Sequence, residues 1–136
     1  MTRYLLDTNV ISELRKSKPH GAVVAWLESL DAEQIFISSV TMGELQAGVE
    51  LTRRQDAAKA NEIESWLAVV ERSFSFLDMD TTCFREWSRL MARRPEALRD
   101  DAMIAATARI HGLKVATRNE RDFVHLAVEI LNPFKS

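Results

Sequence analysis

Short apolar runs recur along the chain and are separated by segments with helical periodicity. The runs lie at residues 3–6, 34–37, 74–77, 113–116 and 128–131. Runs this short that are continuously apolar are typical of strands buried on both faces. Strands that alternate with helices form a parallel sheet covered on both sides. The sequence therefore predicts an α/β fold, with three layers (α/β/α) around a central, mainly parallel sheet.

The segments between these runs have the apolar spacing of helices. Helices are expected near residues 10–14, 22–30, 41–51, 60–74, 81–91 and 100–110. Residues 53–59 fit either a loop or a continuing helix, so the helices flanking them are expected to form a hairpin. Asp80 suits an N-terminal cap and Gly112 a C-terminal cap. Gly48 lies inside a helix, where glycine costs about 1 kcal/mol relative to alanine, and we expect close approach of another backbone to compensate.

Length and composition fit one ordinary soluble domain. The chain has 136 residues, 46% of them hydrophobic, which is enough for a sizeable core. No apolar stretch approaches the roughly 20 residues that span a bilayer. The single cysteine, Cys83, can form neither an internal disulfide nor a cysteine-rich zinc site, and a small core residue is the simpler account. We expect a single domain over residues 1–136, in the cytoplasm and without membrane association.

The net charge neither demands nor excludes a nucleic-acid ligand. It is -2 with a pI near 5.9, unlike that of a strongly basic binding domain. An acidic cluster would lower the net charge while local basic residues still contacted phosphates. The basic pairs that could do so are Arg15/Lys16, Arg53/Arg54, Arg93/Arg94 and Arg118/Arg121, although a solvated surface is the simpler account of each.

Four acidic residues, far apart in sequence, stand where expected strands end or helices begin. They are Asp7, Glu44, Asp101 and Asp122. In an open α/β sheet, ligand sites form outside the carboxyl ends of the strands, so a single pocket could gather all four. Their mutual repulsion would raise their pKa values unless a divalent cation neutralised them. The pattern indicates a metal-dependent site acting on phosphate esters.

Each acid also has a local explanation. Asp101 could cap a helix or complement its dipole, and Glu44 could do the latter. Asp122 could be a turn residue. Asp7 is harder to explain locally, because it ends a strand with no other polar residue among positions 4–6.

Four segments, in order, resemble those of PIN-domain ribonucleases, and more narrowly VapC/FitB-type toxins of bacterial toxin–antitoxin pairs. They are LLDTNVISEL (5–14), SSVTMGELQAGV (38–49), DDAMIAATA (100–108) and ATRNERDF (116–123), followed by Asn132-Pro133-Phe134. The resemblance implies that Asp7, Glu44 and Asp101 are catalytic acids that hold the metal, with Asp100 a neighbour. A fourth catalytic position falls on Asp122 or on Asn119.

The resemblance also implies supporting residues, a cofactor and partners. Thr8, Asn9, Ser38 and Thr117 would orient the carboxylates, with turn and cap bonding as the alternative. Mg²⁺, or Mn²⁺ in its place, would assist hydrolysis of RNA. The partners implied are a second copy of the chain and a cognate antitoxin, which alone would contact operator DNA. Surfaces at residues 22–30 and 44–74, with Trp26 and Trp66, could serve them, unless these residues are core.

Two other functions remain open. A PIN-domain nuclease could process RNA without an antitoxin. A receiver-like signalling domain also gathers acids at strand ends and binds Mg²⁺, and it would form an acyl-phosphate on Asp78 or Asp80. This second alternative needs an acidic pair early in the chain and a late lysine at a strand end. Asp7 has no acidic neighbour, and Lys114 begins its expected strand.

Overall fold

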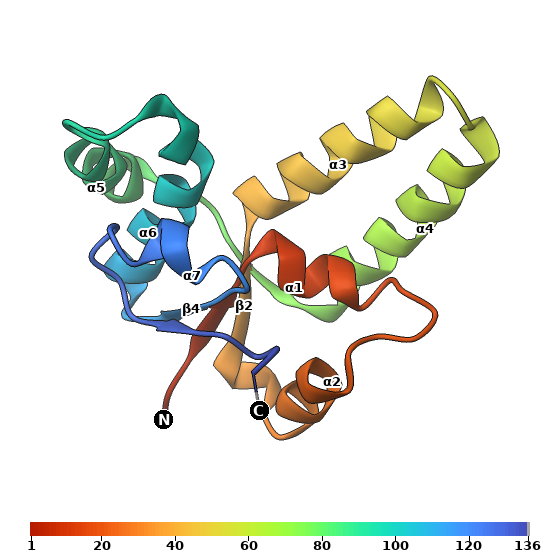
Figure 1. Cartoon of the computed structure of the whole chain (residues 1–136), viewed down its shortest axis with the longest axis horizontal. Coiled ribbons are helices and arrows are strands. Elements are labelled where there is room, and N and C mark those ends of the chain that lie inside the picture. Colours follow the sequence, from red (N-terminus) through yellow and green to blue (C-terminus); the bar gives the residue numbers. More distant parts are fainter. Residues whose placement is uncertain (136) are drawn as a thin grey trace.

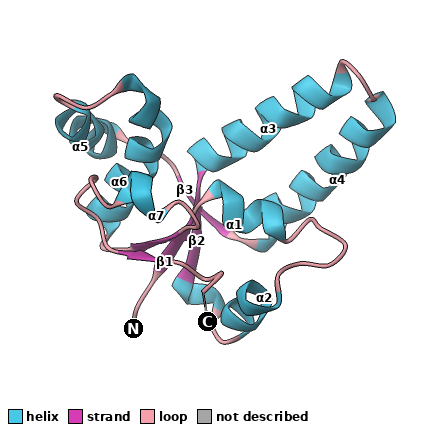
Figure 2. Ribbon diagram, in the orientation of Figure 1, coloured by secondary structure: helices cyan, strands magenta, loops and turns pink. Residues whose placement is uncertain are grey.

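A computed structural model describes residues 1–135 as short strands alternating with helices (Figures 1 and 2). The strands are β1 (Tyr4–Leu6), β2 (Ile35–Ser38), β3 (Ser75–Leu77), β4 (Lys114–Ala116) and β5 (Ile130–Leu131). They form one sheet in the order β3-β2-β1-β4-β5, and every neighbouring pair is parallel. The predicted α/β fold and parallel sheet are therefore confirmed. β5 is shorter than expected and starts at Ile130 rather than Val128.

The helices are α1 (Thr8–Glu13), α2 (Gly21–Glu28), α3 (Ser39–Arg53), α4 (Ala57–Ser73), α5 (Thr81–Met91), α6 (Arg99–His111) and α7 (Glu120–Phe123), with 3-10 turns at Ala32–Gln34 and Glu96–Leu98. Alternation along β1 separates the two faces of the sheet. Tyr4 and Leu6 pack with residues of α1, α2 and α4, whereas Leu5 packs with α5, α6 and α7. The sheet is the middle of three layers.

The central strand, β1, fixes the position of the first acidic residue. Leu5 lies opposite Phe36 of β2 and Val115 of β4, and it is fully buried. The backbone N–H of Asp7 then donates to Ala116 O at 2.9 Å. The Asp7 side chain accepts from Thr8 N, so α1 begins directly after the strand, at Thr8. Asp7 is thus held at the carboxyl edge of the sheet.

α3 and α4 form the predicted helical hairpin, which projects away from the sheet (Figure 1). It has a small core of its own, built from Val49, Ala60 and Leu67. The expectation for Gly48 was wrong: the residue is exposed, and a Cβ built there would meet no atom within 4 Å. Solvent, rather than another backbone, lies on that side of the helix.

Two predicted caps are confirmed. The Asp80 carboxylate accepts from Cys83 N at 2.9 Å at the start of α5. Gly112 ends α6 with φ of 68°, a left-handed conformation that glycine adopts without a steric penalty. No helix within residues 1–135 is long and apolar enough to cross a bilayer.

Candidate active site

An acidic pocket lies at the carboxyl edge of the sheet, where β1 and β4 give way to α1 and the loop before α7. Its volume is about 410 Å³. The lining residues are Asp7, Thr8, Asn9, Ser12, Glu13, Lys16, Glu44, Asp101, Arg118 and Asn119. Three of the four predicted acids, carried by different parts of the chain, therefore line one pocket.

Asp7 is the most firmly held of these acids, with 4% of its surface exposed. Its Oδ1 accepts from Thr8 N at 2.8 Å. Its Oδ2 accepts from Thr117 Oγ1 at 2.8 Å and from Asn9 Nδ2 at 3.1 Å. Burial nevertheless raises the pKa of Asp7, and the charge of Asp122 adds to this, because the three donors offset the cost only in part. The carboxylate is rigidly oriented and short of positive charge.

Glu44 enters the pocket from the second turn of α3. Its Oε1 accepts from Thr8 Oγ1 at 3.0 Å, and the same hydroxyl lies 3.5 Å from Thr41 Oγ1. Burial raises the pKa of Glu44, the charges of Asp7 and Asp100 raise it further, and the Thr8 bond acts against them. Thr8 therefore links the helix that carries Glu44 to the start of α1.

Asp101 has the most perturbed carboxyl group in the pocket. Burial, followed by the charges of Asp7, Asp122, Glu44 and Asp100, raises its pKa from 3.8 to about 7. The capping alternative does not hold, because Leu98 is the N-cap residue of α6. Asp100 is exposed and lies 3.8 Å from Arg99, consistent with its role as a neighbour.

The fourth position is divided between two residues. Asn119 lines the pocket, and its backbone N–H donates to Thr117 Oγ1 at 2.9 Å. Asp122, in α7, is not a lining residue, but its charge raises the pKa of both Asp7 and Asp101. Asp122 thus adds negative charge to the surroundings of the pocket without lining it.

Of the four predicted supporting residues, Thr8, Asn9 and Thr117 contact carboxylates directly. Ser38 follows the capping alternative, because its hydroxyl accepts from Val40 N at 3.1 Å and begins α3. Ser38 therefore caps a helix instead of orienting a carboxylate. It is the last, buried residue of β2 and does not line the pocket.

Glu13, Lys16 and Arg118 also line the pocket. Lys16 and Arg118 belong to basic pairs that the sequence offered as possible phosphate contacts, whereas Glu13 was not predicted as a site residue. Glu13 follows Asn9 by four residues, so α1 presents both on one face, whereas Lys16 lies three residues beyond the last residue of that helix. The spacing from Asn9 was the available signal for Glu13. Arg118 directly follows Thr117, whose own role was predicted.

The donors fit a hard divalent cation in chemistry, since carboxylate and amide oxygens are the ligands that Mg²⁺ prefers. Across residues 1–135, however, no three acidic, histidine or cysteine side chains are arranged as a set that could hold a metal ion. The raised pKa values of Asp7, Glu44 and Asp101 identify the charge that a cation would neutralise. The three acids share a pocket without converging on one point in this conformation.

Comparison with known proteins places the chain in a family, because the PIN domain model matches residues 4–129. The chain belongs to the PIN-domain family of VapC/FitB-type toxins. This PIN domain is 36% identical to the VapC ribonuclease Y4jK of Sinorhizobium fredii, over 96% of this chain and 97% of the relative. It is 35% identical to toxin FitB of Neisseria gonorrhoeae, again over 96% and 97%. The structure of FitAB bound to an IR36 DNA fragment matches with a TM-score of 0.85 and 32% identity, covering 98% of this chain and 96% of that one.

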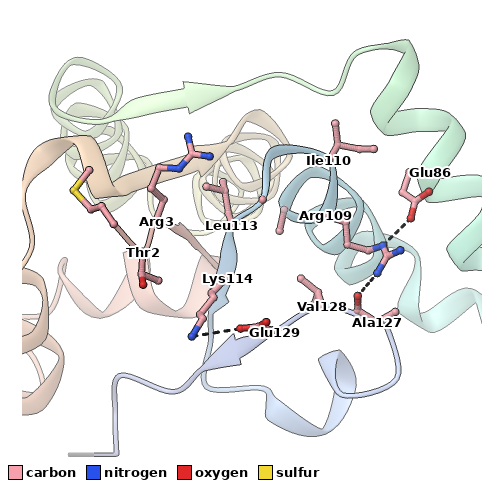
Figure 3. A pocket seen from close by; sticks show the side chains of 13 residues that line it. Thr2, Arg3, Glu86, Arg109, Ile110, Leu113, Lys114, Ala127, Val128 and Glu129 are labelled. Atoms are coloured by element: carbon pink, nitrogen blue, oxygen red, sulfur yellow. Dashed lines mark hydrogen bonds and ion pairs between the residues drawn. The ribbon is translucent and has the colours of Figure 1, made fainter.

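A larger pocket of about 640 Å³ lies at the opposite, amino edge of the PIN-domain sheet (Figure 3). Its charged groups are satisfied by neighbours. Arg109 pairs with Glu86 at 2.7 Å and also donates to Ala127 O, and Lys114 pairs with Glu129 at 3.4 Å. This pocket therefore lacks the excess of negative charge that marks the acidic pocket.

Proposed function

We propose that this PIN domain is a Mg²⁺-dependent endoribonuclease and the toxin of a toxin–antitoxin pair. The observation that carries the proposal is the gathering of Asp7, Glu44 and Asp101 in one pocket at the carboxyl edge of the sheet. The relatives' names, VapC ribonuclease and toxin FitB, support RNA as the substrate and toxicity as the outcome. Mn²⁺ is the expected substitute for Mg²⁺.

Different residues of the pocket would have different roles in this reaction. Asp7, Glu44 and Asp101 would hold the cation, which when bound supplies Lewis-acid stabilisation of a phosphate oxygen and lowers the pKa of water. Thr117 and Asn9 keep the Asp7 carboxylate in one orientation through the bonds to its Oδ2. Asp122 or Asn119 would help to hold a second cation or would orient the attacking water. With a pKa of about 7, Asp101 is partly protonated at neutral pH until a cation enters.

The partners follow from the relatives. FitAB was solved on DNA, and we propose that this chain likewise binds a small antitoxin that carries the operator contacts. A homodimer is proposed for the toxin itself. We further propose that residues 1–136 act as a single domain in the cytoplasm.

The decisive experiment expresses the chain alone in bacteria and sequences the RNA ends that appear. We expect growth arrest, Mg²⁺-dependent cleavage by the purified protein, inhibition by EDTA, and loss of both effects in Asp7→Asn. Cleavage without arrest, together with the absence of a neighbouring antitoxin gene, would favour a processing nuclease. Intact RNA with a stable acyl-phosphate on Asp78 or Asp80 would replace the proposal by a receiver-like function.

A further inference from the structure

The acidic pocket must admit a polyanion, although its centre is itself negative. Four carboxylates line it, those of Asp7, Glu13, Glu44 and Asp101. A bound cation would relieve the centre, but the RNA phosphates on either side would still meet an acidic wall. Cationic side chains at the rim are the groups that can offset this repulsion. Lys16 and Arg118 are the two that line the pocket.

Lys16 and Arg118 differ in how their charge is used. Lys16 Nζ lies 2.9 Å from Glu13 Oε1, so its charge is balanced by this ion pair. Arg118 is exposed, and it takes part in none of the ion pairs formed between residues 1–135. Its positive charge is therefore the one at the rim that is available to an incoming anion.

Arg118 is also held in place, from two sides. Its backbone N–H donates to Asn9 Oδ1 at 3.1 Å, and Asn9 in turn binds Asp7. Its Cζ lies 4.4 Å from the centroid of the Phe134 ring. Stacking on an aromatic face orients a guanidinium and leaves its N–H edge free for a bidentate phosphate contact.

Phe134 is itself anchored by the segment after β5. Its backbone N–H donates to Asn132 Oδ1 at 2.9 Å, and Asn132 Nδ2 donates to Glu120 Oε2 at 3.0 Å. The His20 ring meets Phe134 edge-on, with centroids 5.4 Å apart, where the segment ends beside α2 (Figure 1). A short segment remote in sequence from the acids thus supports the cationic rim.

We propose that Arg118 binds an RNA backbone phosphate next to the scissile one, and that Phe134 is the residue that positions it. This inference rests on the proposed function and adds the residue that brings the substrate to that site. Arg118 would raise affinity for RNA of any sequence, because phosphate contacts carry no base information.

The test measures binding of a fluorescein-labelled single-stranded RNA pool by anisotropy, with every variant made in an Asp101→Asn background to prevent cleavage. For Arg118→Ala we expect a Kd about tenfold higher, the loss of one charge-assisted contact. The slope of log Kd against log salt should fall by about 0.7, the value for one phosphate of a single strand. Arg54→Ala, at the tip of the α3–α4 hairpin, is the matched control and should change neither quantity.

The role of Phe134 is tested by a double-mutant cycle with Arg118 in the same binding assay. Phe134→Leu should weaken binding, Phe134→Trp should restore it, and Arg118→Ala/Phe134→Leu should bind no worse than Arg118→Ala alone. A purely structural role for Phe134 predicts instead additive losses and no rescue by tryptophan. With Asp101 intact, Arg118→Ala should raise KM for cleavage of the same RNA more than it lowers kcat.

The two proposals fail in different ways. If the wild-type protein neither cleaves nor binds RNA, the proposed function and this inference fall together. If the wild-type protein cleaves RNA while Arg118→Ala keeps the wild-type Kd and salt slope, the inference alone is overturned.

Discussion

The two edges of one sheet carry charge in opposite ways. At the amino edge, Glu86 and Glu129 each face a basic partner, and Arg109 holds the pKa of Glu86 below its usual value. At the carboxyl edge, Asp7 and Asp101 face other acids, and their pKa values are raised. Pairs of opposite charge stabilise a fold, whereas a cluster of like charges destabilises it unless a ligand of opposite charge binds. The carboxyl edge is therefore the one built for binding, although its pocket is the smaller.

Removing one acid at each edge gives the largest expected difference. Asp101→Asn should lower Mg²⁺-dependent RNA cleavage by more than about a hundredfold, since even residues behind metal ligands cost 10–100-fold. Glu86→Gln should leave the cleavage rate unchanged. Cleavage assays measure the activity of both variants, and circular dichroism checks that both are folded. Comparable activity in the two variants would contradict the proposed difference between the edges.

Two buried threonines offer a second, smaller contrast. Thr117 donates to Asp7 at 2.8 Å, whereas Thr107 donates to Met103 O within α6 at 2.9 Å. We expect Thr117→Val to weaken Mg²⁺ binding and cleavage by about 10–100-fold, because Asp7 loses the donor that orients it. Thr107→Val removes a hydroxyl of equal burial and should spare both. Isothermal titration calorimetry measures the affinity for Mg²⁺. Equal losses of affinity and cleavage in the two variants would argue for a general packing effect.

The stability of the two edges should respond to pH with opposite signs. The Asp101 pKa is 3.8 unfolded and about 7 folded, so the folded protein binds more protons and its free energy of unfolding falls as pH rises through that interval. In EDTA at pH 8, Asp101→Asn should melt about 3 °C above the wild-type protein, and the gap should close at pH 4. Adding MgCl₂ at pH 8 should raise the Tm of the wild-type protein only.

Glu86 supplies the opposite sign in the same experiment. Its pKa is lowered, so its contribution to stability is present at pH 8 and is lost as pH falls. Glu86→Gln should therefore lower the Tm at pH 8, and this deficit should shrink in acid. If the Tm difference from the wild-type protein changed with pH in the same direction for both variants, the proposed difference between the two edges would be contradicted.

The smallest effect is expected from Gly48, one turn after Glu44 on α3. Because a Cβ there meets nothing within 4 Å, Gly48→Ala should stabilise the protein by about 1 kcal/mol and leave cleavage unchanged. Ala47→Gly, at an exposed neighbouring position, should destabilise it by a similar amount. Urea denaturation measures both changes. A loss of activity in Gly48→Ala would show that the helix carrying Glu44 needs the flexibility of glycine.

The sequence predicted what depends on local pattern. The apolar runs located β1 to β4, and Asp80 and Gly112 marked helix ends through their own chemistry. Asp7, Glu44 and Asp101 stand where strands end or helices begin, and this placement predicted the single pocket that they line in the structure.

The features that local sequence patterns do not predict depend on contacts between distant segments. Nothing near Arg118 specifies that Phe134, sixteen residues later, lies under its guanidinium. Composition likewise does not specify that Asp7, besides ending β1, caps α1, because a capping bond depends on backbone geometry.

The strand order has a consequence for the timing of synthesis. β1 is made first, yet one of its two neighbours in the sheet is β4, whose last residue is Ala116. Thr117, which orients Asp7, follows at once. At about 5–20 residues per second, a ribosome needs roughly 6–23 s to reach that residue. A nascent chain released or stalled before then lacks a wall of its own pocket, so the pocket can form only after Thr117 has been made.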